Sequence, residues 1–524
     1  GRWTIQDGID YPHLLWENAG GTTVDIPTRS YAGEGIEGDP YVLASTVDMV
    51  CMTGRMDDWS SQFILSKDIS LDGVEGYQPP IGFSGTLDGD GHAIRRLTIN
   101  GDSYVGVLGK VVSGGTIYNL RVEDVAVSGI HYVGGLAGWS EGGRIESCNV
   151  NGEIISNGAY AGGLVGYHRS GLITSCSSAC HIRGHSYYIG GLVGDSDYLS
   201  TITSCFATGA IIGTSVYSDY MGGLVGISRG TIAGCYATGE VNGKRYVGGL
   251  AGIKNSGSLT SCYATGGVIG SNYLGGLVGH SDSPTLISCY ATGTVSSTGS
   301  QVGGLVGSTN MTGDSGDSTV VRFCYWDTQT SGLTSSALGI GKTTSELTMV
   351  ETYWGWTDGR WMIQDGIDYP HLVWENTGGT VIDTPTRSDV GQGIQSDPYV
   401  LASAADMVCM TGRMVDQDKH FILTNDVDMD GVGDYIPPIG FSGILDGEGH
   451  AIWNLTINRP GENYLGFIGR MNGGSIRNLG LCTASITGRS YIGGLVGENR
   501  QGLLTCCYMT GSVSGTTFRA GGLV

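Results

Sequence analysis

Apolar and polar residues alternate along most of this chain in short runs that glycines separate. Two such stretches are Phe63 to Gly73 and Phe83 to Ile94. Alternation over four to eight residues is typical of strands that bury one face. The runs are rich in Val, Ile, Thr, Tyr and Ser, which favour strands and turns over helices. The pattern therefore predicts an all-β protein of many short strands.

The strands belong to a repeat whose clearest phrase runs from Tyr246 to Gly252 and continues from Ser258 to Gly266. The first glycine of its Gly-Gly pair recurs in steps of 28, 28, 32, 26, 27 and 28 residues. These glycines are Gly134, Gly162, Gly190, Gly222, Gly248, Gly275 and Gly303. A period of this length is typical of a solenoid, in which each turn buries its apolar face against its neighbours. We predict a right-handed parallel β-helix with turns of about 28 residues.

A longer repeat is superimposed on the first. Residues 1–18 return almost unchanged as residues 359–376, and the correspondence continues to Asn100 and Asn458 before a shift of two residues. The sequence predicts the tail and linker of one module at 1–32 and a complete module at 33–377. A linker at 378–390 and the first part of a nearly identical module at 391–524 follow.

Three short helices are expected beside the strands. Ser45 with Asp48, and Ser403 with Asp406, have the spacing of an N-cap and an acidic first turn, and Thr343 with Glu346 has the spacing of a capping box. We interpret the helices that begin near Ser45 and Ser403 as covers over the open end of each solenoid, because terminal repeats need a cover.

Cysteine recurs once per turn, three positions after Ile or Leu. The column comprises Cys148, Cys176, Cys205, Cys235, Cys262, Cys289 and Cys507. Adjacent turns would bring such residues within disulfide range. Leu120 and Leu479 occupy the equivalent position in other turns, however, and leucine replaces a buried apolar residue rather than half of a disulfide. We therefore predict a stack of free, buried thiols.

If the cysteines point inward, the alternation of a strand directs the Tyr that follows each cysteine outward, the next Ala inward and the next Thr outward. This predicts a surface column of Tyr236, Tyr263 and Tyr290 beside Thr208, Thr238, Thr265 and Thr292. Such columns offer aromatic and hydroxyl groups to sugars or to a neighbouring fibre. Simple stabilisation between neighbouring strands explains them as well.

Net charge and composition exclude some partners. The formal charge of −22 argues against nucleic acid and anionic membranes, and no apolar run is long enough to span a bilayer.

Asp426, Asp428 and Asp430 resemble the start of a calcium loop, but Pro437 stands where the bidentate Glu belongs. An amphipathic strand explains the acidic residues equally well. No other cofactor is expected. Lys and Arg are thinly spread, so an enzyme, as in carbohydrate-active β-helices, is only a remote alternative.

The repeated phrases of Tyr104 to Gly307, resuming at Tyr464, resemble the GLUG motif repeats of secreted and cell-surface proteins of bacteria and archaea. The resemblance implies an extracellular β-solenoid without implying one activity. Its peptidase members need a His-Glu-x-x-His motif, and this chain has no His-Glu pair.

These observations lead us to expect a non-enzymatic structural protein of a fibre, stalk or filament, with other copies or modules of itself as partners. The alternative is an adhesin or glycan-binding module that uses the Tyr and Thr columns.

Overall fold

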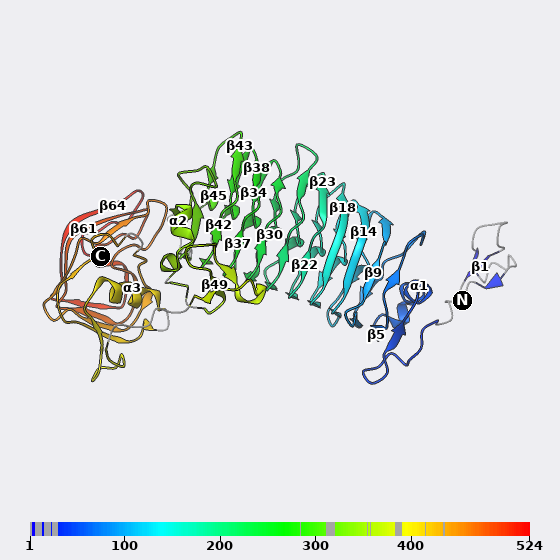
Figure 1. The fold of residues 1–524 in the computed structure, drawn as a ribbon, viewed down its shortest axis with the longest axis horizontal. Coiled ribbons are helices and arrows are strands. Elements are labelled where there is room, and N and C mark those ends of the chain that lie inside the picture. Colours follow the sequence, from blue (N-terminus) through cyan, green and yellow to red (C-terminus); the bar gives the residue numbers. More distant parts are fainter. Residues whose placement is uncertain are drawn as a thin grey trace. The chain divides into compact units, whose positions relative to one another are not determined.

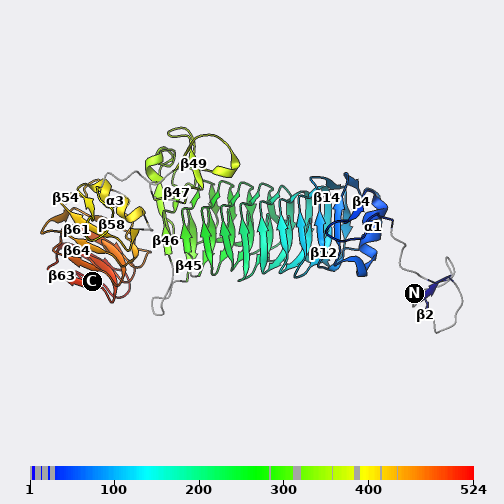
Figure 2. The ribbon, with the colours of Figure 1, turned by 90° about the horizontal axis from the view of Figure 1, so that it is seen from below.

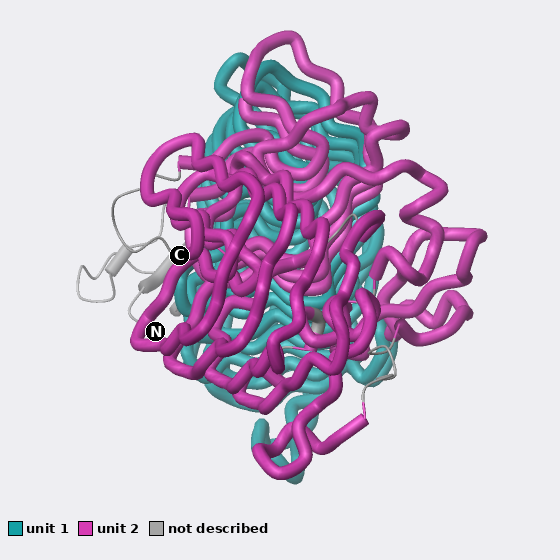
Figure 3. Tube along the Cα trace, turned by 90° about the vertical axis from the view of Figure 1, so that its left-hand side faces the viewer, with its two compact units in different colours: residues 1–253, 266–272 teal, residues 254–265, 273–524 magenta. Residues whose placement is uncertain are grey.

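A computed structural model describes residues 3–5, 13–14, 22–23, 30–282, 285–310, 320–353, 355–356, 358–382, 390–413, 416–432 and 435–524. The chain divides into two compact units (Figure 3). Unit 1 contains Gly1–Ile253 and Gly266–Asn272, and unit 2 contains Lys254–Thr265 and Tyr273–Val524. The predicted linker falls mainly on residues 383–389, outside the described residues, and the module boundaries stay a prediction.

Unit 1 is a parallel β-solenoid, as predicted, and its strands stack in four columns (Figures 1 and 2). The first column contains β11 (Ser103–Val105), β15 (His131–Gly134), β19 (Ala161–Gly162), β24 (Ile189–Gly190), β29 (Met221–Gly222) and β34 (Arg245–Gly248). The second contains β7 (Ile81–Phe83), β12 (Leu108–Val111), β16 (Ala137–Glu141), β20 (Val165–Arg169), β25 (Val193–Ser196) and β30 (Val225–Ser228).

The other two columns complete each turn. The third contains β4 (Tyr41–Leu43), β5 (Gln62–Leu65), β8 (Thr86–Asp88), β13 (Thr116–Tyr118), β17 (Arg144–Glu146), β21 (Gly171–Thr174), β26 (Ser200–Thr203) and β31 (Thr231–Ala233). The fourth contains β6 (Ile69–Ser70), β9 (Ala93–Arg95), β10 (Thr98–Asn100), β14 (Arg121–Gly129), β18 (Asn149–Ser156), β22 (Ser177–Ser178), β23 (His181–Gly184), β27 (Phe206–Ala207), β28 (Ile211–Gly213), β32 (Tyr236–Ala237), β33 (Val241–Asn242) and β38 (Val268–Gly270).

Equivalent residues of successive turns lie opposite one another. In the third column Ile117, Ile145, Ile173, Ile202 and Ile232 form one register, and all are fully buried. The Gly-Gly pairs permit close stacking, because a Cβ on Gly191 would lie 2.0 Å from the carbonyl oxygen of Gly223. Only glycine fits such a backbone contact.

Unit 2 begins with more turns of the same kind. Its strands are β36 (Ser258–Thr260), β37 (Tyr263–Ala264), β40 (Val278–Ser281), β41 (Thr285–Ile287), β42 (Tyr290–Ala291), β43 (Val295–Ser297), β44 (Val302–Gly303), β45 (Val306–Thr309), β46 (Val320–Arg322), β47 (Tyr325–Asp327) and β48 (Ile340–Lys342). Two more strands, β35 (Ala251–Lys254) and β39 (Asn272–Gly275), begin in one unit and end in the other.

The segment that follows these turns, which we call the arm, comprises residues 344–382. It contains α2 (Thr344–Leu347), η3 (Val350–Tyr353), β49 (Trp361–Ile363), β50 (His371–Leu372), η4 (Val373–Glu375) and β51 (Thr380–Val381). The capping box of Thr343 and Glu346 at α2 is confirmed. In Figure 2 the strand β49 lies outside the stacked strands of the solenoid. Unit 1 has a matching antiparallel sheet of β1 (Trp3–Ile5), β2 (His13–Leu14) and β3 (Thr22–Thr23), with the registers of β49 to β51.

The rest of unit 2 repeats the opening of the solenoid. Its strands are β52 (Tyr399–Leu401), β53 (His420–Leu423), β54 (Val427–Asp428), β55 (Ile439–Phe441), β56 (Ile444–Asp446), β57 (Ala451–Trp453), β58 (Thr456–Asn458), β59 (Ile468–Asn472), β60 (Ser475–Arg477), β61 (Gly480–Gly488), β62 (Val496–Arg500), β63 (Leu503–Thr505) and β64 (Tyr508–Gly515).

The two predicted covering helices are present as α1 (Thr46–Gly54) in unit 1 and α3 (Ala404–Gly412) in unit 2. The hydroxyls of Ser45 and Ser403 accept the backbone N–H of Asp48 and Asp406, each at 3.2 Å, so both N-caps are confirmed. Helix α3 buries Met407 and Met410 in the same core as strands β52 and β53, which places it over the first turn of its solenoid.

Candidate functional site

The cysteine column lies in the core, as predicted. In unit 1, Cys148, Cys176, Cys205 and Cys235 are free and fully buried, as are Cys262 and Cys289 in unit 2. Leu120 and Leu479 are equally buried, and Cys507 is partly buried at the last turn of unit 2. Burial raises the pKa of Cys205 and Cys289 well above the usual range, so these thiols stay protonated.

The thiols also bond to the backbone, which the sequence did not reveal. The Sγ of Cys205 donates to the carbonyl of Thr203 at 3.1 Å and accepts the N–H of Cys176 from the preceding turn at 3.3 Å. The residue before each cysteine has a positive φ, such as 53° at Ser204. Cys506 occupies this corner position before Cys507, and its exposure follows from that. The column stabilises corners of the solenoid.

The predicted surface column of tyrosines is wrong for two of its three members. Tyr263 is 3% exposed and Tyr290 is 1% exposed. The arm covers both, and Trp361 lies 6.0 Å from the ring of Tyr263 and 5.8 Å from that of Tyr290. Their hydroxyls donate to Glu375 at 2.8 Å and to the carbonyl of Pro370 at 2.6 Å.

The remaining members of that predicted surface differ in exposure. Tyr236, in unit 1, is half-buried and stacks on Phe206 at 5.0 Å. Thr208, Thr238 and Thr265 are exposed as predicted, whereas Thr292 is only 9% exposed. Alternation fixes which side of a strand a residue occupies, but it carries no information about segments that later fold over that side.

A second tyrosine column, which the sequence reasoning missed, lies in unit 1. Each ring stacks on the next at 4.8 to 5.2 Å. Its members are Tyr104, Tyr132, Tyr160, Tyr188, Tyr220 and Tyr246, and each has a φ between 55° and 68°. The signal was a tyrosine two residues before each Gly-Gly pair. Neighbouring rings cover the ring faces, so this column offers edges and hydroxyls to a partner, and not the open faces that sugars stack on.

A parallel row of side chains packs against these tyrosines. Trp139 lies 4.4 Å from Tyr167 and 4.9 Å edge-on from Tyr132. The next residue in the row is Asp195, which is 3% exposed and pairs with Arg229 at 2.8 Å. Burial raises the pKa of Asp195 to about 7, and the Arg229 charge opposes that rise.

A column of polar side chains lies inside unit 1. Ser140, His168, Ser196 and Ser228 are aligned through β16, β20, β25 and β30, and all are fully buried. Neither ring nitrogen of His168 has a hydrogen-bond partner within the described part of the chain. Burial lowers the pKa of this histidine to about 4, so the ring is neutral at physiological pH.

Two carboxylates of the predicted calcium loop accept hydrogen bonds from neighbouring groups. Asp426 accepts the N–H of Ala451 at 2.9 Å, and Asp428 accepts the N–H of Asp430 at 3.0 Å and the Nδ2 of Asn454 at 2.9 Å. Asp426, Asp428 and Asp430 are all exposed while Val427 and Met429 between them are buried, which is the pattern of an amphipathic strand. Among the residues that the structure describes, no group of three His, Cys, Asp or Glu side chains is arranged to hold a metal ion.

Unit 1 has an open surface depression of about 350 Å³ lined by Glu141, Arg169, Ser170, Asp197, Tyr198 and Leu199. Tyr198 and Leu199 are 66% and 81% exposed. On a longer loop of the same unit, Val216 and Tyr217 are 68% and 61% exposed. Adjacent exposed apolar side chains, such as Tyr198 and Leu199 in this depression, are typical of contact surfaces.

Comparison with known proteins supports the predicted resemblance. The model of the GLUG motif matches residues 129–155, 185–212 and 270–296. Halomucin of Haloquadratum walsbyi is 32% identical over 167 residues, which is 27% of this chain and 2% of that protein. A protein of Evansella cellulosilytica described as a Gly-rich membrane protein is 32% identical over 122 residues, which is 21% of this chain and 14% of that protein. The chain thus spans a small fraction of each relative.

Two solved structures align with this chain at low similarity. An immunoglobulin A1 protease from Bacteroides ovatus aligns with 65% of this chain and 94% of its own, at 20% identity and a TM-score of 0.39. A second IgA1 protease aligns with 60% of this chain and 22% of its own, at 16% identity and a TM-score of 0.35. In the described residues we find no helix with the length and hydrophobicity needed to cross a bilayer.

Proposed function

We propose that this chain, which carries GLUG-motif repeats, is part of an extracellular structural protein whose stacked turns form a fibre, stalk or filament. The observation that carries the proposal is the unbroken register of equivalent residues from turn to turn, exemplified in unit 1 by Ile117 through Ile232. Each added turn extends such a solenoid by about 4.8 Å, so the number of repeats sets length.

The chemistry of the repeats supports a mechanical role. Buried thiols, stacked tyrosines and paired glycines all connect one turn to the next. Buried carboxylates serve structural bonds too: Asp48 accepts the backbone N–H of Ala44 at 2.9 Å, Asp219 pairs with Arg245 at 2.7 Å, and Asp327 accepts the hydroxyl of Tyr369 at 2.6 Å. We propose on this basis that the chain is not an enzyme and that its partners are other copies or modules of itself.

A location at the cell surface is part of the proposal. One relative is described as a membrane protein, and the formal charge of −22 keeps a long array soluble and away from anionic lipid headgroups. Labelling of intact cells tests this location directly. Antibodies against the exposed loop around Tyr217 should label intact cells of the source organism, and labelling only after lysis would contradict the proposed location.

The fibre proposal is tested by changing the number of turns. Duplicating the four turns from Gly135 to Gly248 should lengthen the particle by roughly 19 Å in small-angle X-ray scattering, at 4.8 Å per turn. The control inserts a flexible Gly-Ser segment of the same length at the same point. A duplication that leaves the maximum dimension unchanged, or that matches the flexible control, would contradict the proposal.

An adhesin is the second candidate, and the exposed Tyr198, Leu199, Val216 and Tyr217 favour it. These side chains replace Tyr263 and Tyr290 as the surface to test. Replacing all four by serine should abolish binding to glycan arrays or to host cells if the chain is an adhesin. The control is Met56→Ser with Ile81→Ser, because these apolar residues of the same unit are also exposed and lie outside both predicted columns.

A further inference from the structure

Arg322, the last residue of β46 in unit 2, is a buried cation with unused hydrogen-bonding groups. The residue is 2% exposed, and its Nη2 donates to the carbonyl of Pro437 at 2.6 Å. Its Nε and Nη1 are buried and have no acceptor among the described residues. Burial, together with the charge of Arg459, lowers the pKa of Arg322 to about 10, so the guanidinium remains charged at neutral pH. A buried charge with unsatisfied donors is strongly unfavourable unless something binds to it.

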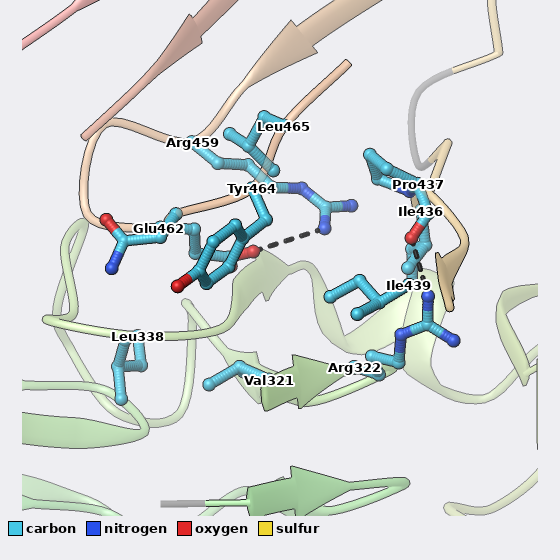
Figure 4. Close-up of a pocket in the computed structure, with 11 residues that line it drawn as sticks. Val321, Arg322, Leu338, Ile436, Pro437, Ile439, Arg459, Glu462, Tyr464 and Leu465 are labelled. Carbon is cyan, nitrogen blue, oxygen red and sulfur yellow. Dashed lines mark hydrogen bonds and ion pairs between the residues drawn. The ribbon is translucent and has the colours of Figure 1, made fainter. Parts of the chain in front are cut away.

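The donors border a small cavity of about 20 Å³ (Figure 4). Its lining includes Arg322, Pro437, Ile439, Arg459, Glu462 and Leu465. Arg459 donates to Glu462 at 3.4 Å and to the carbonyl of Tyr435 at 3.2 Å. The lining thus contains two guanidinium groups and one carboxylate, and this carboxylate pairs with Arg459, which leaves the charge of Arg322 uncompensated.

The size and charge of this cavity define what it can hold. A cavity needs about 10 to 15 Å³ to hold one water molecule, so this one admits a single particle of that size. A water molecule would accept the free N–H groups but would leave the charge uncompensated. Sulfate and phosphate are too large. The amide oxygen of Asn463 is also unpartnered, and turning this amide over would present a further donor, Nδ2, to an anion.

We propose that a small monovalent anion such as chloride binds in this cavity, held by the Nε and Nη1 of Arg322. The bound anion connects β46 to the loops that carry Pro437 and Arg459. The second module contains a two-residue insertion here, Arg459 and Pro460. Asn458 aligns with Asn100, an offset of 358 residues, whereas Tyr464 aligns with Tyr104, an offset of 360 residues. The loop that carries Arg459 is thus a feature of the second module, and the site is independent of the proposed fibre function.

Bromide provides the direct test, because it replaces chloride and scatters anomalously. Crystals of the full chain grown in sodium bromide should show an anomalous peak beside Nε and Nη1 of Arg322. In solution, chloride added at constant ionic strength, balanced with gluconate, should raise the thermal unfolding midpoint of unit 2 in a saturable manner. Arg322→Gln should remove the peak and weaken the chloride effect at least tenfold.

Arg477→Gln is the matched control, because Arg477 is a half-exposed arginine of the same unit that pairs with Asp446 at 2.7 Å. It should keep both the peak and the chloride response. A wild-type crystal without a peak would mean that the cavity holds water, and a peak that survives Arg322→Gln would mean an adventitious ion only. Either result overturns the proposal. If Arg322→Gln fails to fold, Arg459→Gln and the wild-type bromide data carry the same test.

Discussion

His168 is the buried group whose replacement has the most calculable effect. Its ring is fully buried in β20 of unit 1, and its pKa falls from an ordinary 6.5 to about 4 because burial disfavours the charged form. The folded state therefore binds fewer protons than the unfolded state between these two pH values. The contribution of His168 to the free energy of unfolding is fully present above pH 6.5 and is lost as the pH falls towards 4.

The size of the effect follows from the shift of the pKa. Each unit corresponds to about 1.4 kcal/mol, so lowering the pH from 7.5 to 4 costs roughly 3 kcal/mol at this residue. Serine occupies the same place in neighbouring turns at Ser140, Ser196 and Ser228, which makes His168→Ser a native-like replacement. We expect the variant to gain about 3 kcal/mol relative to wild type as the pH falls to 4.

The comparison of wild type with the variant cancels the pH-dependent stability that comes from other titrating groups. Asp195, in the same unit, has a pKa raised to about 7, so its contribution to stability is present at low pH and is lost as the pH rises from about 4 to 7. This trend has the opposite sign, but it is common to wild type and variant. Hydrogen exchange of peptides that cover β20, measured in urea at several pH values, gives the difference. A difference that does not vary with pH would refute the reasoning.

Three further predictions concern the arm, the thiols and the glycines. Trp361→Ala should destabilise the arm by about 3 to 5 kcal/mol and expose Tyr263 and Tyr290 beneath it to nitration. Trp374→Ala, the control at a 40% exposed residue, should not increase nitration. Equal nitration in both variants would contradict the covering of these tyrosines by the arm. In the native protein a thiol reagent should label Cys506 first and Cys507 next. After unfolding without reductant it should label all 13 cysteines. Absence of reactive thiols in the unfolded chain would contradict the buried thiol stack. Gly191→Ala should prevent close stacking and abolish folding of unit 1, and a soluble variant with native circular dichroism would contradict the contact geometry.

Sequence alone determined the features that repeat. These features are the period of the Gly-Gly pairs, the inward cysteines and the N-caps at Ser45 and Ser403. They depend only on neighbouring residues or on equivalent turns, so comparing the repeats within this one chain was enough to predict them. Leu120 in the place of a cysteine was enough to predict a buried thiol, and the structure places that residue in the core.

Tertiary structure decided what happens where the repeat is interrupted. The contact of Tyr263 with Glu375 joins residues 112 positions apart, and no local pattern encodes it. The positive φ of Tyr160 and the unsatisfied guanidinium of Arg322 likewise depend on backbone corners and on loops from distant segments. Periodicity determines on which side of a strand a residue lies, because that is set by local geometry. Whether that side meets solvent, an arm or a second module is set by long-range packing, which only the folded chain reveals.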